Sequence, residues 1–245
     1  MKQNRLRMFS KLAGQRPAGP ICRSGLSFAA DYLAAGFAFS RYPGGEEKTA
    51  VLIHGWGVRA SSMAALAEML HRAGYSVLNY DYPSSKKSIR RHAEMFLSCF
   101  RREHLRGKVH FLTHSMGGLI LRCALAEMSE SECRAIDSIV MLGPPNLGSP
   151  LALIGKAEPV RSLNVSLGDM VPGSDALRIP APRYLPPVGI IAGTLDGKVP
   201  FESTALPGGL PFQRTVVACT HPGLRDPRNT GILIQYFFQH KTFQK

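Results

Sequence analysis

Hydrophobic positions alternate between two spacings along most of the chain. Apolar residues recur at helical spacing over four segments, residues 61–73, 87–105, 116–129 and 227–240. Short runs rich in β-branched residues predict strands at residues 49–53, 75–80, 108–113, 137–142, 188–193 and 214–219. This alternation is typical of a mostly parallel central sheet with helices on both faces. We therefore expect an α/β fold.

Residues 147–187 interrupt the alternation. The segment is rich in glycine and proline and keeps no sustained hydrophobic period, which indicates irregular structure. It lies between two predicted strands, so it is an insertion rather than a linker between two cores. We interpret it as a cap or lid-like insertion in an α/β domain of residues 48–245.

Residues 1–47 precede the alternating region. Six basic and no acidic residues occur in residues 1–23, and an apolar stretch at residues 25–40 follows. The basic part is too long for an ordinary secretory signal, and the apolar part is too short to span a bilayer. We predict a basic extension with one amphipathic element. The helical spacing of its apolar residues favours a helix packed on the core, with an interfacial membrane element as the alternative. The apolar residues at helical spacing are Leu26, Ala30, Leu33 and Phe37.

The composition fits a globular protein of one large domain. The chain has 245 residues, of which 44% are hydrophobic and 19% are charged. Its five cysteines are odd in number and never spaced as Cys-x-x-Cys, which argues against a disulfide framework and a thiolate zinc site. Reduced cysteines favour a cytoplasmic location, with peripheral membrane association as the alternative. No spacing of histidines and carboxylates suggests a metal site, so we expect no metal and no cofactor.

Positive charge gathers in two segments. The net charge is +13, and residues 86–108 hold eight basic and two acidic residues in addition to the basic residues of 1–23. The second segment falls on a predicted amphipathic helix, so a solvated helix face is the favoured interpretation, with an anionic membrane surface or acidic substrate as the alternative. No aromatic residues interleave with the bases, and we expect no nucleic acid partner. The apolar stripe of that helix is Ile89, Ala93, Phe96 and Phe100.

A candidate nucleophile lies between a predicted strand and a predicted helix. Thr113-His-Ser-Met-Gly-Gly118 has the form of a nucleophile elbow, a tight turn that lifts the Ser115 hydroxyl above the edge of the sheet. The turn needs small neighbours, which Gly117 and Gly118 supply. Thr113 departs from the usual glycine and places a β-branched side chain where space is short. We predict that Ser115 is the nucleophile.

Two backbone N–H groups are candidates for an oxyanion hole. In an elbow, one donor follows the nucleophile and the other lies in the loop after an earlier strand. Met116 follows Ser115, and His54-Gly-Trp-Gly57 follows the strand at residues 49–53. We therefore assign the oxyanion hole to the N–H groups of Trp56 and Met116, and expect a structural role for His54.

A base and an orienting acid are expected after the serine, at the carboxyl ends of later strands. His221 follows the strand at residues 214–219, and its imidazole is suited to accept the serine proton. Asp196 follows the strand at residues 188–193 and is the favoured acid. Asp169 and Asp175 also follow the serine, but they lie within the irregular segment.

Several of these motifs together resemble the small lipase-like α/β-hydrolases of bacteria, over residues 48–243. The resemblance implies a triad of Ser115, Asp196 and His221, and an oxyanion hole formed by Trp56 and Met116. It also implies hydrolysis of lipid or acyl esters through an acyl-enzyme. An acyltransferase with the same triad, or a binding protein that retains the fold, is the alternative. The motifs are His54-Gly-Trp-Gly, Tyr80-Asp-Tyr-Pro-Ser, Thr113-His-Ser-Met-Gly-Gly, Leu142-Gly-Pro-Pro-Asn-Leu-Gly-Ser, Asp196-Gly-Lys-Val-Pro and Thr220-His-Pro.

Overall fold

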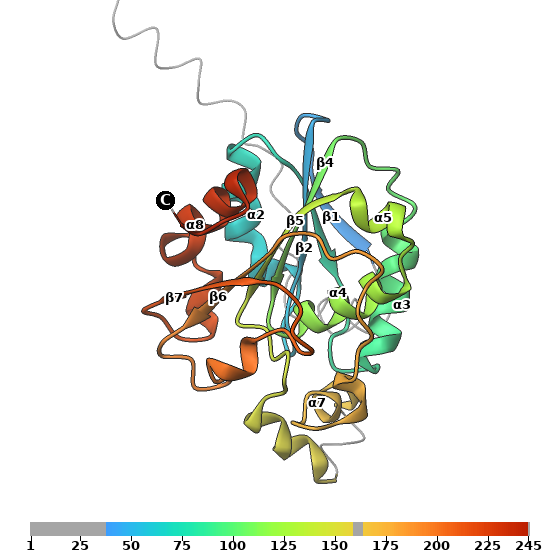
Figure 1. Cartoon of the computed structure of the whole chain (residues 1–245), viewed down its shortest axis with the longest axis vertical. Coiled ribbons are helices and arrows are strands. Elements are labelled where there is room, and N and C mark those ends of the chain that lie inside the picture. Colours follow the sequence, from blue (N-terminus) through green and yellow to red (C-terminus); the bar gives the residue numbers. More distant parts are fainter. Residues whose placement is uncertain (1–37, 159–163, 245) are drawn as a thin grey trace, which may run out of the picture. The chain divides into compact units, whose positions relative to one another are not determined.

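A twisted sheet in the order β1-β3-β2-β4-β5-β6-β7 forms the centre of the computed structural model, which describes residues 38–158 and 164–244 (Figure 1). Strands β2 to β7 are parallel to one another, and β1 pairs antiparallel with β3 at one edge. The sheet confirms the predicted α/β fold. The strands are β1 Ala38–Tyr42, β2 Lys48–Ile53, β3 Ser76–Asp81, β4 Lys108–His114, β5 Ile136–Leu142, β6 Val188–Gly193 and β7 Gln213–Val217.

Helices cover both faces of this sheet. In Figure 1, α2 and α8 lie on one face, and α3, α4 and α5 lie on the other. None of the helices within residues 38–158 and 164–244 combines the length and hydropathy needed to cross a membrane. The helices are α2 Ala64–Arg72, α3 Ile89–Phe100, α4 Met116–Glu127, α5 Glu130–Arg134, α7 Val165–Asp169 and α8 Pro227–His240, with short 3-10 turns η1 Ala60–Met63, η2 Pro150–Lys156, η3 Asp175–Leu177, η4 Glu202–Thr204 and η5 Pro222–Arg225.

The central strands are hydrophobic on both sides because helices bury both faces of the sheet. In β2, Val51 and Ile53 pack in the core under α3 and α4, whereas Ala50 and Leu52 pack in the core under α2 and α8. All four side chains have 0% exposed surface. The uninterrupted apolar run in the sequence is therefore a buried parallel strand.

The predicted start of the α/β domain at residue 48 is wrong. Strand β1 pairs with β3 from Ala38 to Tyr42, so this part of residues 1–47 belongs to the sheet. It lies in the compact unit Ala35–Lys245. The last residues of the predicted amphipathic element, 38–40, are extended because β1 completes the edge of the sheet; the rest of that element lies outside the described residues.

Two predicted helices extend too far. The helix predicted at residues 87–105 ends at Phe100, because residues 101–107 turn back toward β4 and both His104 and Gly107 adopt positive φ. The helix predicted at residues 116–129 ends at Glu127, and a second helix, α5, begins after Ser129. Ser129 and Glu132 bond each other's backbone N–H groups in a capping box, which starts the new helix there.

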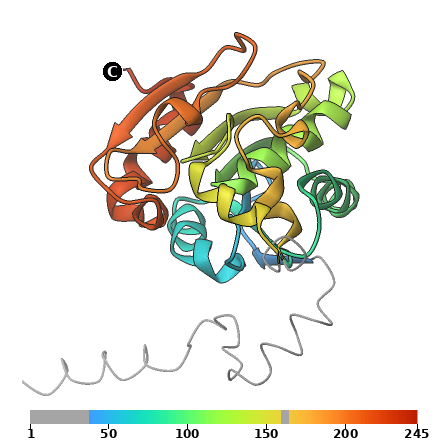
Figure 2. The same cartoon turned by 90° about the horizontal axis from the view of Figure 1, so that it is seen from below.

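Residues 147–187, which we call the cap segment, contain η2, α7 and η3 and otherwise irregular chain. Figure 2 shows these elements in front of the sheet, seen from below. The cap segment is tied to the loop between β3 and α3: Ser166 Oγ donates to Ser84 O at 2.5 Å, and Val165 N donates to Ser85 O at 3.1 Å. These hydrogen bonds therefore fix the position of the cap segment on the α/β core.

Candidate active site

Ser115 occupies a strained turn between β4 and α4. Its backbone has φ 53° and ψ −126°, a conformation that L-residues rarely adopt. Hydrogen bonds on both sides hold the turn: Ser115 N donates to Leu142 O at 2.8 Å, and Gly118 N donates to Ser115 O at 2.9 Å. This geometry has the sharp strand-turn-helix form that the sequence motif predicts.

Two glycines allow the turn to pack closely against β2 and its loop. A Cβ atom on Gly117 would lie 2.4 Å from Ile53 O, and one on Gly55 would lie 2.9 Å from Ser115 Cβ. Neither position has room for a side chain. Thr113, where the motif usually has glycine, is fully buried. The elbow accommodates it, so the departure at this position does not prevent the turn from forming.

His221 and Asp196 are brought together from two loops at the carboxyl ends of β6 and β7. His221 Nδ1 donates to Asp196 Oδ2 at 2.6 Å, and both side chains are buried. Asp196 Oδ1 also accepts hydrogen bonds from Lys198 N and Val199 N. Burial opposes ionisation of Asp196, but the hydrogen bonds from His221 and these N–H groups outweigh it, so its pKa lies below the ordinary value.

Ser115 and His221 line the same cavity. No hydrogen bond joins the Ser115 hydroxyl to the imidazole in the structure of residues 38–158 and 164–244. Gly143, at the end of β5, leaves room for the imidazole and the carboxylate: a Cβ atom there would lie 3.2 Å from both Asp196 Oδ2 and His221 Nδ1. The three predicted residues thus all lie at the carboxyl ends of the strands.

The other two candidate acids lie elsewhere. Asp169 Oδ2 accepts a hydrogen bond from Ile89 N at 2.7 Å, which satisfies the first N–H of α3, and burial raises the pKa of Asp169. Asp175 is exposed and pairs with Arg178. Neither carboxylate contacts His221 in the described structure.

The loop after β2 is held from β3 and from the loop that follows it. Asp81 accepts hydrogen bonds from Arg59 Nε at 2.8 Å and from Ala60 N at 2.9 Å. Burial opposes ionisation of Asp81, but these bonds and the adjacent His54 hold its pKa far below the ordinary value. Ser84 Oγ accepts from Gly57 N at 2.9 Å. The loop is therefore fixed on the C-terminal side of Trp56.

Trp56 and Met116 retain free backbone donors. Neither N–H forms a hydrogen bond with any residue in the described part of the chain. Met116 is the first residue of α4, where an N–H has no partner within the helix. Trp56 lines the cavity that contains Ser115. The structure thus leaves two unpaired N–H groups on the two segments that flank the serine.

His114 contacts the backbone of His221. Its Nε2 donates to His221 O at 3.1 Å, and the two rings lie 4.7 Å apart. Burial holds the pKa of His114 well below its ordinary value, with a smaller contribution from His221 and Arg225. A neutral ring with its proton on Nε2 is therefore the form that supports His221. His114 therefore lines the cavity together with Ser115 and packs against the imidazole of His221.

The cavity beside Ser115 has a volume of about 70 Å³. The cap segment supplies one wall through Leu151, Ala152, Leu167 and Met170, and the loop after β2 supplies Trp56 and Val58. Pockets that enclose a whole drug-sized ligand measure about 300–1,000 Å³. This cavity is therefore sized for the part of a substrate that lies next to the serine.

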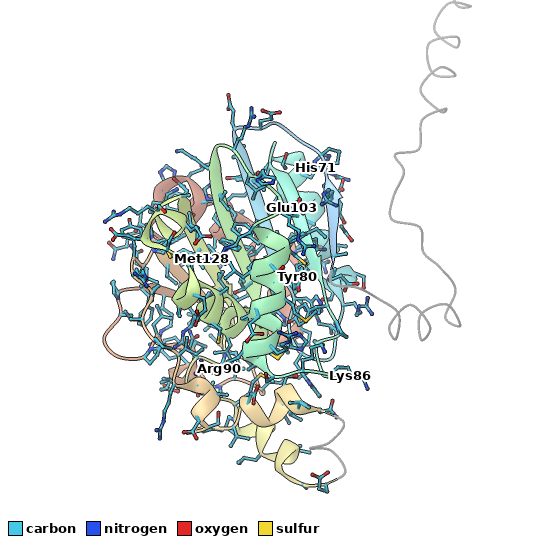
Figure 3. The ribbon with its side chains drawn as sticks, turned by 90° about the vertical axis from the view of Figure 1, so that its right-hand side faces the viewer. His71, Tyr80, Lys86, Arg90, Glu103 and Met128 are labelled. Atoms are coloured by element: carbon cyan, nitrogen blue, oxygen red, sulfur yellow. The ribbon has the colours of Figure 1, made fainter. Side chains whose placement is uncertain are left out.

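A larger hollow of about 590 Å³ lies between α3 and α4, and none of the candidate residues lines it. Figure 3 looks onto the face that α3 covers, with Arg90 near the cap segment and Glu103 toward the opposite end of α3. Arg101, at the rim of this hollow, is paired with Glu132 at 2.7 Å. In residues 38–158 and 164–244, no three histidine, cysteine or acidic residues are grouped in a way that suits a metal ion.

Residues 50–238 match the model of the alpha/beta hydrolase family, and the chain belongs to this family. The mature lipase BlEst2 of Bacillus licheniformis has a similar structure, with a TM-score of 0.64 at 16% identity over 82% of this chain and 97% of that one. Lipase B of Aspergillus fumigatus has a TM-score of 0.63 at 17% identity, over 79% of this chain and 53% of that one. A monoacylglycerol lipase from Paleococcus ferrophilus has a TM-score of 0.55 at 18% identity, over 84% of this chain and 99% of that one. Comparison with curated proteins finds no match.

Sequence reasoning missed four residues that shape the site. Gly143 and Ser84 lie within motifs that we had quoted, but their contacts depend on how the loops pack. His114 also lies within such a motif, and its bond to His221 depends on the same loop packing. Arg225, four residues after His221, lines the cavity together with Ser115. Its position just after the base was the available signal.

Proposed function

We propose that this protein is a serine hydrolase that cleaves carboxylic esters through an acyl-enzyme on Ser115. The observation that carries the proposal is the 2.6 Å bond between His221 and Asp196 at the cavity of a strained serine. With its proton on Nδ1, the imidazole presents an unprotonated Nε2 to accept the hydroxyl proton.

The reaction has two halves. Ser115 Oγ attacks the ester carbonyl while His221 takes its proton, and the carbonyl oxygen becomes an oxyanion that the N–H groups of Trp56 and Met116 hold. The C–O bond to the alcohol then breaks, and His221 returns the proton to the departing alcohol. Water, deprotonated by His221, attacks the acyl-enzyme. The bond between the acyl carbon and Ser115 Oγ then breaks, His221 returns the proton to Ser115 Oγ, and the acid is released. Asp196 stabilises the imidazolium in both halves.

Lipid or acyl esters are the substrate class that we favour. The cap wall of the cavity is apolar, and the similar structures named above are lipases, which agrees with an acyl chain beside the serine. Because the cavity is small, a long chain would extend over the outer surface of the cap segment. Exposed apolar side chains gather on this cap and on the β6–β7 connection: Leu147, Leu151, Leu153, Ile154, Val165, Leu195 and Phe201.

Turnover of 4-nitrophenyl butyrate and 4-nitrophenyl palmitate tests the proposal. Ser115→Ala should lower kcat by about 10⁴-fold or more, because the covalent step is lost. Ser98→Ala, an exposed serine on α3, is the matched control and should retain activity. Equal rates in the wild type and Ser115→Ala would end the proposal. Product analysis with added alcohols separates hydrolysis from acyl transfer.

The exposed cap side chains also support contact with an anionic lipid surface. Lys86 and Arg90 lie at the end of α3 nearest to the cap segment (Figure 3). Sedimentation with vesicles that contain phosphatidylserine should pull down the wild type more than the double variant Leu153→Ser, Ile154→Ser. Ile232→Ser, which changes an exposed apolar residue on α8, is the control. Equal sedimentation of all three proteins would contradict this contact.

A further inference from the structure

The cavity that contains Ser115 is lined by basic but not by acidic residues. Lys198 and Arg225 both contribute to its lining, and the remaining residues are apolar or uncharged apart from the two histidines. Arg225 ends η5, which begins directly after His221. Lys198 is two residues after Asp196. Both cations therefore lie on the loops that carry Asp196 and His221, and both line the cavity.

Arg225 has no carboxylate partner in the described part of the chain. Its Nε is buried and forms no hydrogen bond, and burial alone lowers its pKa, with no acidic side chain contributing. By contrast, Arg59 pairs with Asp81, and Arg228 pairs with Asp226. A buried Nε without an acceptor is unfavourable, and the planar fork of a guanidinium fits a carboxylate or phosphate. The guanidinium of Arg225 is therefore suited to bind an anionic ligand.

Asp196 does not fill that role. Its side chain is only 2% exposed, Oδ2 accepts from His221, and Oδ1 accepts from two backbone N–H groups. The negative charge of Asp196 is thus committed to the imidazole and to its own loop. The cationic character of the cavity lining remains available to a substrate.

We propose that the cavity selects esters that carry an anionic group, a carboxylate or a phosphate, close to the scissile bond. Arg225 binds that group through its guanidinium, and Lys198 adds a second positive charge. The inference rests on the proposed esterase function and deepens it. The net charge of +13 also attracts such substrates from solution.

Paired substrates test the selection. Neutral 4-nitrophenyl hexanoate is compared with the 4-nitrophenyl half ester of adipic acid, and phenyl acetate with 4-acetoxybenzoate and 4-acetoxyphenyl phosphate. The measured quantity is the ratio of kcat/KM for the anionic ester to kcat/KM for its neutral partner. Dividing the wild-type ratio by that of a variant cancels the intrinsic reactivity of each ester.

Arg225→Gln should lower this ratio by about tenfold or more, and Arg225→Lys by less, because Lys retains the charge without the fork. Lys198→Gln should lower it to a smaller extent. Arg228→Gln removes an exposed charge on α8 and should leave the ratio as in the wild type. If the ratio falls only for the esters that carry a carboxylate, the site binds a carboxylate. If it falls only for the ester that carries a phosphate, the site binds a phosphate. Ratios that Arg225→Gln leaves unaltered for all esters would overturn the proposal.

A binding measurement decides the inference separately from turnover. Adipate and phenyl phosphate should raise the melting temperature of the wild type and of Arg228→Gln, but not that of Arg225→Gln. Equal stabilisation of all three proteins would contradict a site at Arg225. If the wild type binds these anions at Arg225 yet hydrolyses no ester, the proposed reaction fails while the anion site stands.

Discussion

Ser115 has an unfavourable backbone conformation that neighbouring residues hold in place. Among the described residues other than glycine, only Ser115, His104 and Lys241 adopt positive φ. Such a conformation costs about 1–3 kcal/mol. The hydrogen bond from Ser115 N to Leu142 O and the close approach of Gly117 to β2 offset that cost. The position of the hydroxyl therefore depends on residues that never touch a substrate.

Gly117→Ala should destabilise the elbow. The added methyl group would lie 2.4 Å from Ile53 O, so α4 has to move away from β2. Overpacking of this kind costs about 1–3 kcal/mol, and we expect that loss in urea unfolding together with reduced esterase activity. Gly45→Ala, which meets no atom within 4 Å, is the control. Similar unfolding midpoints for the two variants would contradict the proposed packing constraint.

Asp196→Asn should preserve the fold and remove most of the activity. An amide would no longer stabilise an imidazolium at His221 and would favour the wrong tautomer, so kcat should fall by about 10³–10⁴-fold. The exposed Asp175 provides the matched control through Asp175→Asn. Steady-state kinetics on a short acyl ester would reveal the difference. Comparable activity in the two variants would remove Asp196 from the mechanism.

At the scale of elements, Ser84 joins the loop after β2 to the cap segment. Its hydroxyl accepts from Gly57 N, and its carbonyl accepts from Ser166 Oγ on α7. Ser84 thus hydrogen-bonds both the loop that carries Trp56 and the cap segment that lines the cavity. A change at Ser84 should alter the reactive geometry more than it alters binding.

Ser84→Ala should lower kcat more than it raises KM. The variant removes the acceptor for Gly57 N, and an unsatisfied N–H costs about 1–3 kcal/mol, which loosens the loop that holds the Trp56 donor. Ser166→Ala removes only the bond from α7 and should have a smaller effect on kcat. Steady-state kinetics of both variants check this order. Equal kcat values for Ser84→Ala and the wild type would contradict a role for Ser84.

The regular elements were predictable because burial on both faces produces long apolar runs. Strand β6 and helix α8 begin and end where the sequence pattern predicts. Strand β1 was missed because an edge strand carries little apolar signal: of its five residues, only Phe39 is buried. Helix α5 was also missed, although Ser129 and Glu132 have the spacing of a capping box. That signal is short and was hidden by the apolar run before it.

The candidate residues were chosen from the order of strands and loops, but their contacts could not be predicted that way. The sequence places His221 and Asp196 after strands, whereas their 2.6 Å bond depends on β6 and β7 being neighbours in the sheet. The same holds for Arg225, whose lack of an acidic partner is evident only once the loops are in place.

For the whole molecule, buried histidines make stability depend on pH. Burial lowers the pKa of His92 to about 4 and holds that of His114 well below its ordinary value. Both are neutral in the folded protein, while the unfolded chain binds protons below about pH 6.5. The native state therefore binds fewer protons in this range, and stability falls as the pH decreases from 6.5 toward 4.

Urea unfolding at pH 7 and pH 5 measures this loss, which should approach about 1.4 kcal/mol per pH unit for each histidine. His92→Phe should reduce the slope by the contribution of one group, whatever its effect on the stability at pH 7. A midpoint that stays constant between the two pH values, or a slope that His92→Phe does not reduce, would contradict neutral burial of His92.

Covalent labelling by a fluorophosphonate, located by peptide mass spectrometry, tests the central claim most directly. The phosphonyl group should be found on Ser115, and labelling should fall to background in Ser115→Ala and slow by orders of magnitude in His221→Ala. These results would show an activated hydroxyl that depends on the imidazole. A wild-type protein that remains unlabelled, or that is labelled equally well without His221, would contradict the account.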